Sequence, residues 1–163
     1  MEKIMWLVLG SVACVAALRA ARSQRAMLVG RWAVGTLMIV FGAVVNAIYL
    51  VVDPAYYADF ADPSPFAFVR DTWDSFVAPN MSFFITLLVI FEAIVGAMVL
   101  SGGRRTQAGL VALMAFHVGQ LAFGGVMWIW APVMLVTFWL LLRAERQSYT
   151  TRAGGHPTHH VSA

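Results

Sequence analysis

The sequence predicts an all-α protein: a transmembrane helix bundle followed by a polar tail. Of its 163 residues, 61% are hydrophobic and only 12% are charged, and the mean hydropathy is +0.77. A soluble domain carries about a quarter charged residues, and a soluble core of this size cannot bury so much apolar surface. The many aromatic residues exclude disorder, and the single cysteine, Cys14, excludes a disulfide scaffold.

Four apolar runs are long enough to cross a bilayer, which takes about 20 residues. Two are 32–52 and 81–100. The 36 residues 107–142 hold no Asp, Glu, Lys or Arg, and a single helix of that length would measure about 54 Å. Gly124-Gly125 divides this run into spans near 107–123 and 126–142, and Pro132 either kinks the last helix or marks its start.

The N-terminal run 4–18 is shorter but has basic residues at both ends, Lys3 and Arg19, that can snorkel to the interfaces. The alternative is a cleaved signal peptide. No small-x-small cleavage site precedes a polar start, and a cluster of arginines follows instead. We therefore expect an uncleaved first helix, which makes five spans in all.

The distribution of basic residues predicts the orientation of the bundle. Nine of the eleven lie in the link after the first helix, in 101–106 and in the C-terminal segment. These segments share one side if the N-terminus is outside and the C-terminus is cytoplasmic. The expected location is the cell membrane, with residues 1–146 as the bundle and 147–163 as a disordered cytoplasmic tail.

Residues 53–80 form the largest loop and contain seven aromatic residues within 28 positions. Aromatic residues interspersed with acids are typical of a membrane–water interface. The spacing of Phe66, Val69, Trp73 and Phe76 predicts a short amphipathic helix over 66–78. Such a loop either anchors neighbouring helices or acts as a lid for a partner or substrate.

Glu92 lies in the middle of its span, where a charged side chain costs about 2.5–3.5 kcal/mol on insertion scales. Polar residues and glycines share one stripe on each of three helices, and such stripes favour close contact inside a bundle. Matching of depth at 1.5 Å per residue gives Glu92 two candidate partners, His117 and Arg31, and matches Asn46 to Gln120. The candidate intramembrane polar site is therefore Glu92, His117, Gln120, Asn46 and Arg31.

Two interpretations of this site stay open: the polar residues fasten the bundle, or they line a cavity that handles protons or binds a ligand. Haem ligation would need a second intramembrane histidine, and Cys14 has no partner for thiol–disulfide chemistry. No catalytic residue and no metal site are expected. The tail histidines lack the acidic or cysteine partners that define a metal site; they are His156, His159 and His160.

Two segments carry a family resemblance. RWAVGTLMIVFGAVVNAIYLVVDPAYY resembles the first helix of DoxX-like membrane proteins, and FEAIVGAMVLSGGRRTQAGLVALMAF resembles their next two helices, with Glu92 as the membrane glutamate. The resemblance covers about residues 31–143. It implies a four-helix core, here with an added N-terminal helix, and an association with membrane redox systems. The family often has a lysine after its second glycine, where this chain has Asn46.

Three functions follow as expectations. The first is a non-catalytic accessory subunit, held by its glycine-rich faces and its aromatic loop in a larger membrane complex, which the resemblance links to redox systems, with no cofactor of its own. The second is a quinone-linked oxidoreductase component in which Glu92 and His117 move protons. The third is a small lipid or metabolite carrier. In each case the partners are the lipid bilayer and other membrane subunits; the basic residues suit anionic lipids and do not imply nucleic acid.

Overall fold

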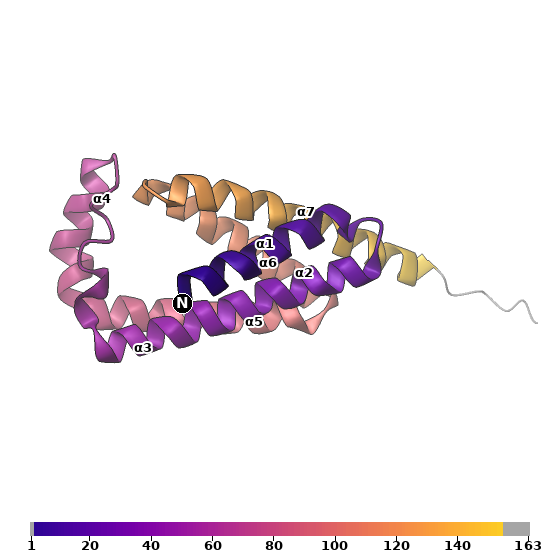
Figure 1. The fold of residues 1–163 in the computed structure, drawn as a ribbon, viewed down its shortest axis with the longest axis horizontal. Helices are drawn as coiled ribbons and strands as arrows, with labels where there is room; N and C mark the ends of the chain where they lie inside the picture. The colour runs from indigo at the N-terminus through magenta and orange to yellow at the C-terminus, as the bar shows by residue number, and fades with distance from the viewer. Residues whose placement is uncertain (1, 155–163) are drawn as a thin grey trace, which may run out of the picture.

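A computed structural model describes residues 2–154 of the protein, and these form a bundle of helices running along one long axis (Figure 1). The main helices are α1 (Glu2–Ala20), α2 (Gln24–Thr36), α3 (Val45–Val52), α5 (Met81–Ser101), α6 (Gly103–Gln120) and α7 (Met127–Gly154). A π-helical segment, Leu37–Val44, joins α2 to α3 without a break. The predicted all-helical bundle is therefore confirmed.

Four helical segments within the described residues are long and apolar enough to cross a membrane: Gln24–Val52, Ala67–Ser101, Gly103–Phe123 and Met127–Ser148. They contain the predicted spans 32–52, 81–100 and 107–123. The last segment begins at Met127, one residue after the predicted start of the span 126–142. A fifth apolar helix, Ile4–Ala20, is shorter. Most large side chains on the outer faces of these segments are apolar and exposed, as expected of helices that face lipid.

Both glycine pairs end helices, and the break at Gly124-Gly125 is the one predicted from the run 107–142. Gly102 and Gly103 have φ of 92° and 62°, and Gly124 and Gly125 have φ of 70° and 54°. These positive values suit glycine because it lacks the Cβ that disfavours this region. Pro132 lies inside the second turn of α7, where it leaves the carbonyl of Trp128 without its usual helical donor.

The N-terminal helix α1 packs against both α2 and α7. Its contact face is made of small residues: Ala13, Ala17 and Ala20 are at most 5% exposed. A Cβ atom at Gly10 would lie 2.5 Å from the ring of Trp130, so glycine is needed for this close approach. The ring of Trp6 stacks on that of Trp130 with centroids 3.4 Å apart. The first helix is thus an integral part of the bundle.

Residues 53–80, here called the cap, cover one end of the bundle (Figure 1). The cap includes the 3-10 turn Pro54–Tyr57, α4 (Ala67–Thr72), the π-helical turn Trp73–Val77 and the 3-10 turn Ala78–Asn80. The expected helix over 66–78 is confirmed. Ser64 Oγ donates a hydrogen bond to the carbonyl of Ala122 at 2.6 Å, and Trp73 Nε1 donates to the carbonyls of Tyr57 and Ala58. These bonds fasten the cap both to the bundle and to itself.

The opposite end, here called the arginine end, holds the turn 21–23, the turn at Gly102-Gly103 and the C-terminal part of α7 (Figure 1). The three arginine-rich segments therefore meet at one end of the bundle. One expectation is wrong: α7 continues through Gly154, so residues 147–154 are helical where the sequence predicts the start of a disordered tail. Residues 147–153 are polar but contain no glycine or proline, so no strong helix breaker ends α7 before Gly154.

Candidate functional site

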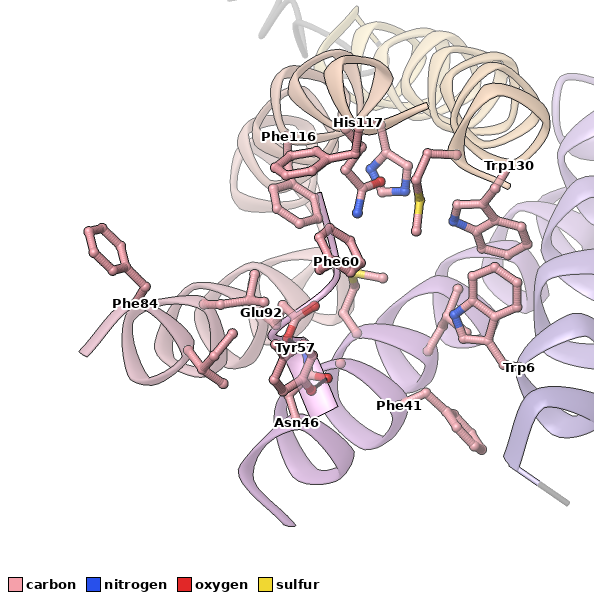
Figure 2. A pocket seen from close by; sticks show the side chains of 18 of the residues that line it. Trp6, Phe41, Asn46, Tyr57, Phe60, Phe84, Glu92, Phe116, His117 and Trp130 are labelled. Atoms are coloured by element: carbon pink, nitrogen blue, oxygen red, sulfur yellow. Dashed lines mark hydrogen bonds between the residues drawn. The ribbon is translucent and has the colours of Figure 1, made fainter. Parts of the chain in front are cut away.

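A cavity of about 360 Å³ lies beneath the cap, between the π-helical segment and α5, α6 and α7. This volume is within the range of small-molecule sites, about 300–1,000 Å³. Its walls are mainly aromatic and aliphatic, and its polar groups come from five side chains (Figure 2). Those five are Asn46, Tyr57, Glu92, His117 and Gln120. Four of the five predicted site residues therefore share this cavity.

Asn46 is the centre of the polar wall. Its Nδ2 donates a hydrogen bond to Glu92 Oε2 at 2.8 Å, and its Oδ1 accepts one from the hydroxyl of Tyr57 at 2.7 Å. Glu92 is 7% exposed and points inward, as predicted. The predicted match of Asn46 with Gln120 is wrong as a pairing, since both polar atoms of the Asn46 amide bond to other groups. The chain of three residues links the cap to the middle of α5.

Gly42 makes room for the Glu92 carboxyl group. A Cβ atom at position 42 would lie 2.8 Å from Glu92 Cδ and 2.9 Å from Oε1, both well inside van der Waals contact. Gly42 belongs to the π-helical segment that precedes Asn46 by two residues. π-Helical segments are rare and occur frequently at functional sites. The wider turn and the missing side chain together let the carboxyl lie against the backbone.

His117 forms the opposite wall of the cavity and is 1% exposed. Its Nδ1 lies 2.9 Å from the carbonyl of Leu113, and because a carbonyl oxygen only accepts, Nδ1 is the donor of that bond. The ring also contacts Phe138 edge-on at 4.9 Å between centroids. No hydrogen bond joins His117 to its predicted partner Glu92, which bonds to Asn46 instead; the two residues line opposite sides of one cavity (Figure 2).

Gln120 supplies an unsatisfied acceptor. Its Oε1 is buried and has no hydrogen-bond partner among the residues that the structure describes. Buried polar atoms almost always have a partner in the protein or in ordered solvent. An unpartnered buried oxygen in the wall of a cavity is therefore a position at which a donor on a ligand or a water molecule can bind.

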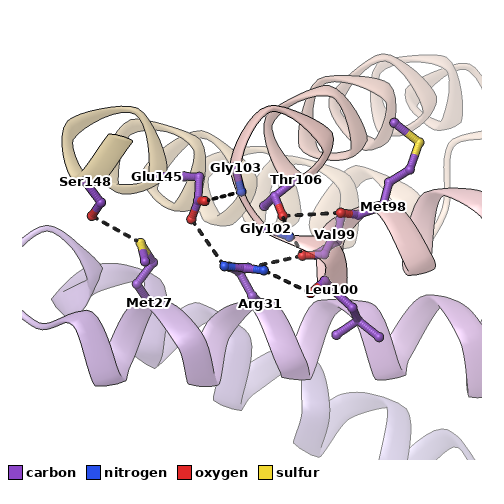
Figure 3. Close-up of polar contacts among 10 residues, drawn as sticks. All are labelled: Met27, Arg31, Met98, Val99, Leu100, Gly102, Gly103, Thr106, Glu145 and Ser148. Atoms are coloured by element: carbon purple, nitrogen blue, oxygen red, sulfur yellow. Dashed lines mark hydrogen bonds and ion pairs between the residues drawn. The ribbon is translucent and has the colours of Figure 1, made fainter. Parts of the chain in front are cut away.

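Arg31 does not belong to this site, and its predicted pairing with Glu92 is wrong. The guanidinium lies at the arginine end, where NH1 is 3.6 Å from Glu145 Oε2 (Figure 3). Its Nε and NH2 donate to the carbonyls of Val99 and Leu100 at 3.1 and 3.0 Å. Arg31 therefore binds the C-terminal turn of α5 and does not reach toward its centre.

The cluster at the arginine end complements the dipoles of two helices. The cation of Arg31 sits on the carbonyl end of α5, and Glu145 Oε1 accepts from the N–H of Gly103, the first residue of α6, at 2.9 Å. Helix C-termini favour cations and N-termini favour anions. Both side chains are nearly buried, at 11% and 7% exposed. The cluster joins α2, α5, α6 and α7 and has a structural role.

Two residues of these clusters were not singled out by sequence reasoning. Tyr57 is one of seven aromatics in the cap, and only its position at the end of the Asp53-Pro54 turn distinguishes it. Glu145 is the one acid among the arginines of the C-terminal segment. An isolated acid amid basic residues at the end of a span is a signal that it pairs with a cation in the bundle.

The chemistry of the cavity is that of hydrogen bonding and proton transfer. A carboxyl, an amide, a phenol and an imidazole surround a space walled by aromatic rings. No group of three or more potential metal ligands among histidine, cysteine, aspartate and glutamate occurs in the described part of the chain. The tail histidines at 156, 159 and 160 lie outside it. Comparison with protein-family models, curated proteins and solved structures finds no match for this chain.

Proposed function

We propose that this protein is an integral membrane component that binds a quinone-class ligand in the cavity beneath the cap. The observation that carries the proposal is the enclosed set of Asn46, Glu92 and Tyr57 facing His117 and the unpartnered oxygen of Gln120. Such a set offers donors and acceptors on opposite walls of an aromatic pocket. This pattern suits a flat ring that carries two oxygen atoms on opposite edges.

The chemistry of quinone reduction fits these groups. A quinone takes up two electrons and two protons to become a quinol. Glu92 and His117 are groups that can transfer protons, because a carboxyl and an imidazole each change protonation state without a change in fold. The electrons would come from a donor in a partner subunit. The proposed role is therefore that of a quinone-binding subunit in a larger, redox-linked membrane complex.

The packing of the glycines favours a binding site over a purely accessory role. A Cβ atom at Gly35 would lie 2.5 Å from the side chain of Leu100, and one at Gly96 would lie 3.2 Å from the carbonyl oxygen of Gly35. The stripes of small residues thus pack against each other inside this chain. Because these faces are buried in the bundle, docking to a partner has to use other surfaces.

The resemblance to DoxX-like proteins supports the same proposal. We assign the four long helical segments to the core expected of that family and α1 to the added helix. Glu92 stands at the position of the family's membrane glutamate, and it lies in the cavity. Asn46 stands near the position of the family's lysine and bonds directly to Glu92. An amide in place of a cation leaves this pair less charged.

Binding can be tested with the purified full chain in lipid nanodiscs. The probe is 2,3-dimethoxy-5-methyl-1,4-benzoquinone, a ring without a tail, and the signal is quenching of tryptophan fluorescence, because three tryptophans line the cavity. We expect saturable binding to the wild-type chain. Asn46→Leu should weaken it by about 5- to 150-fold, because it removes the amide that holds Glu92 and Tyr57 in the polar wall, and loss of such a hydrogen-bonded group costs roughly 1–3 kcal/mol.

The matched control is Thr86→Val, which removes a polar group from the exposed face of α5, where Thr86 Oγ1 bonds only within its own helix to the carbonyl of Ser82. It should bind the probe like the wild type. Quenching that does not saturate, or equal affinities for Asn46→Leu and Thr86→Val, would contradict the proposal.

We further propose that the cap faces the outside of the cell membrane and that the arginine end faces the cytoplasm, with α1 as a fifth crossing. In a Cys14→Ala background, Asp62→Cys places a thiol on the exposed surface of the cap and Gln147→Cys places one on the exposed surface of α7. An impermeant maleimide should label intact cells at position 62 and label position 147 only after permeabilisation. The reverse pattern would overturn the orientation, and an N-terminal tag tests the first crossing separately.

A further inference from the structure

A second cavity, of about 510 Å³, adjoins the first between the start of α1, the π-helical segment with α3, the cap and the start of α7. Its lining is almost entirely apolar or aromatic. The residues are Trp6, Leu7, Phe41, Val45, Asn46, Tyr49, Tyr56, Phe60, Val126 and Met127. The polar groups that the proposed function uses, apart from Asn46, do not line it.

The two cavities are neighbours. They share five lining residues, Trp6, Phe41, Asn46, Phe60 and Met127. Figure 2 shows Trp6 and Phe41 on one side of the first cavity and Asn46 with Glu92 on another. Asn46 therefore stands at the boundary, with its amide turned to Glu92 and Tyr57 and its helix forming a wall of the apolar cavity. A molecule that touches the polar wall therefore lies next to the second cavity.

The rim of the second cavity has the character of a lipid-facing surface. Leu7 on α1 is 54% exposed, and Val126, in the turn before α7, is 64% exposed. Tyr56, 46% exposed, completes the rim on the cap side and stacks on Tyr49. Exposed aliphatic side chains at the edge of a transmembrane bundle favour contact with acyl chains over contact with water.

The aqueous side of the first cavity is closed by the cap. Tyr57 is 7% exposed and Ser64 is 3% exposed. Phe60 and Trp73 both pack on Phe123, with centroids 5.0 and 5.5 Å apart. The hydrogen bonds of Ser64 and Trp73 hold this lid in place. A ligand that comes from water would have to displace all of these contacts, whereas a ligand dissolved in the bilayer meets the open rim of the second cavity.

We infer that the ligand of this site is a lipid-dissolved molecule with a long apolar tail, that it enters sideways from the bilayer, and that its tail occupies the second cavity while its ring reaches Asn46 and Glu92. The inference rests on the proposed function and adds the substrate class: a tailed membrane quinone in place of a small water-soluble one. Trp6 and Phe41 lie at the junction between ring and tail.

The test compares two probes with the same ring on the full chain in nanodiscs: the tailless benzoquinone used above and its analogue with a ten-carbon tail. Val45→Phe fills part of the second cavity, because Val45 lines that cavity and not the first. Val44→Phe is the matched control. Val44 precedes Val45 in the chain, is 48% exposed and lines neither cavity. For each probe, only the ratio of its affinities for two variants is used. Partition of the probe into the bilayer affects both affinities equally and does not change this ratio.

We expect Val45→Phe to weaken binding of the tailed probe at least about tenfold, the equivalent of roughly two buried methylene groups, while the tailless probe stays within about twofold. Val44→Phe should change neither affinity. Leu7→Phe, at the exposed rim, serves as a second blocking variant should Val45→Phe fold poorly, and it should give the same pattern.

The inference is overturned if both blocking variants bind the tailed probe like the wild type, or if they weaken both probes equally. In those cases Asn46→Leu still reports on the ring site, so the proposed function survives alone. Failure of both probes to bind the wild-type chain would overturn the proposed function and this inference together.

Discussion

Replacing Arg31 by methionine is expected to lower the free energy of unfolding of the bundle by about 3–5 kcal/mol, the usual cost of breaking a buried ion pair by removing one partner. The change leaves the Glu145 carboxylate buried without its cation. It also leaves the carbonyls of Val99 and Leu100 without the guanidinium that binds them. Unfolding in mixed micelles with increasing dodecyl sulfate, followed by circular dichroism, measures the loss.

Two further variants make this result specific. Arg25→Met removes an exposed arginine from the first turn of the same helix and should cost less than about 1 kcal/mol. The double variant Arg31→Met with Glu145→Leu removes both charges, so it should recover much of the lost stability. If Arg31→Met were no more destabilising than Arg25→Met, the cluster at the arginine end would not be a structural fastener.

Gly42→Ala is expected to weaken binding of the tailless quinone by about 10- to 100-fold. The variant displaces the Glu92 carboxyl group, and a hydrogen bond to such a group contributes roughly 1.5–3 kcal/mol. The added methyl group would lie 2.8 Å from Glu92 Cδ, so the flexible side chain of Glu92 has to move. Its movement breaks the 2.8 Å bond from Asn46 Nδ2. Fluorescence titration in nanodiscs measures the change in affinity.

Gly119→Ala is the matched control, because a Cβ atom at Gly119 meets nothing within 4 Å. Alanine has the higher helix propensity, so this variant should be at least as stable as the wild type and should bind the probe normally. Equal affinities of the two alanine variants would show that the position of the Glu92 carboxyl does not matter for the ligand.

The architecture could be predicted from the sequence because lipid imposes a simple rule. Backbone polar groups in the bilayer have to be satisfied within helices, so span lengths and glycine breaks are visible in the composition alone. The pair at 124–125 ends a helix where expected. The predicted end of the last helix is wrong because the prediction used polarity alone, and a helix can continue past its apolar region.

The inward direction of Glu92 could also be predicted, but its partners could not. Matching of depth treats each helix as a straight α-helix that rises 1.5 Å per residue. The chain from Gln24 to Val52 contains eight π-helical residues, which change the direction of every side chain after them. Asn46 follows that segment directly, so its pairing with Glu92 depends on a distortion that periodicity does not reveal.

The pairing of Arg31 failed for a different reason. Arg31 has a long side chain, and depth alone allowed it to reach toward Glu92 or to remain near the end of the bundle. The structure shows the second arrangement. At the arginine end, Arg31 contacts both Glu145 on α7 and the C-terminal carbonyls of α5. Whether Arg31 pairs with Glu92 or with Glu145 depends on which helices are neighbours, and periodicity and depth do not give that.

The cluster at the arginine end also bears on how the chain is made. The ribosome synthesises Arg31 early, but the acid that neutralises it belongs to the last helix. At about 5–20 residues per second, Glu145 follows Arg31 by roughly 6–23 s. During that interval the guanidinium has only the bilayer interface and, later, the carbonyls of α5. The bundle therefore lacks the acid that pairs with Arg31 until α7 has been made and has packed against α2.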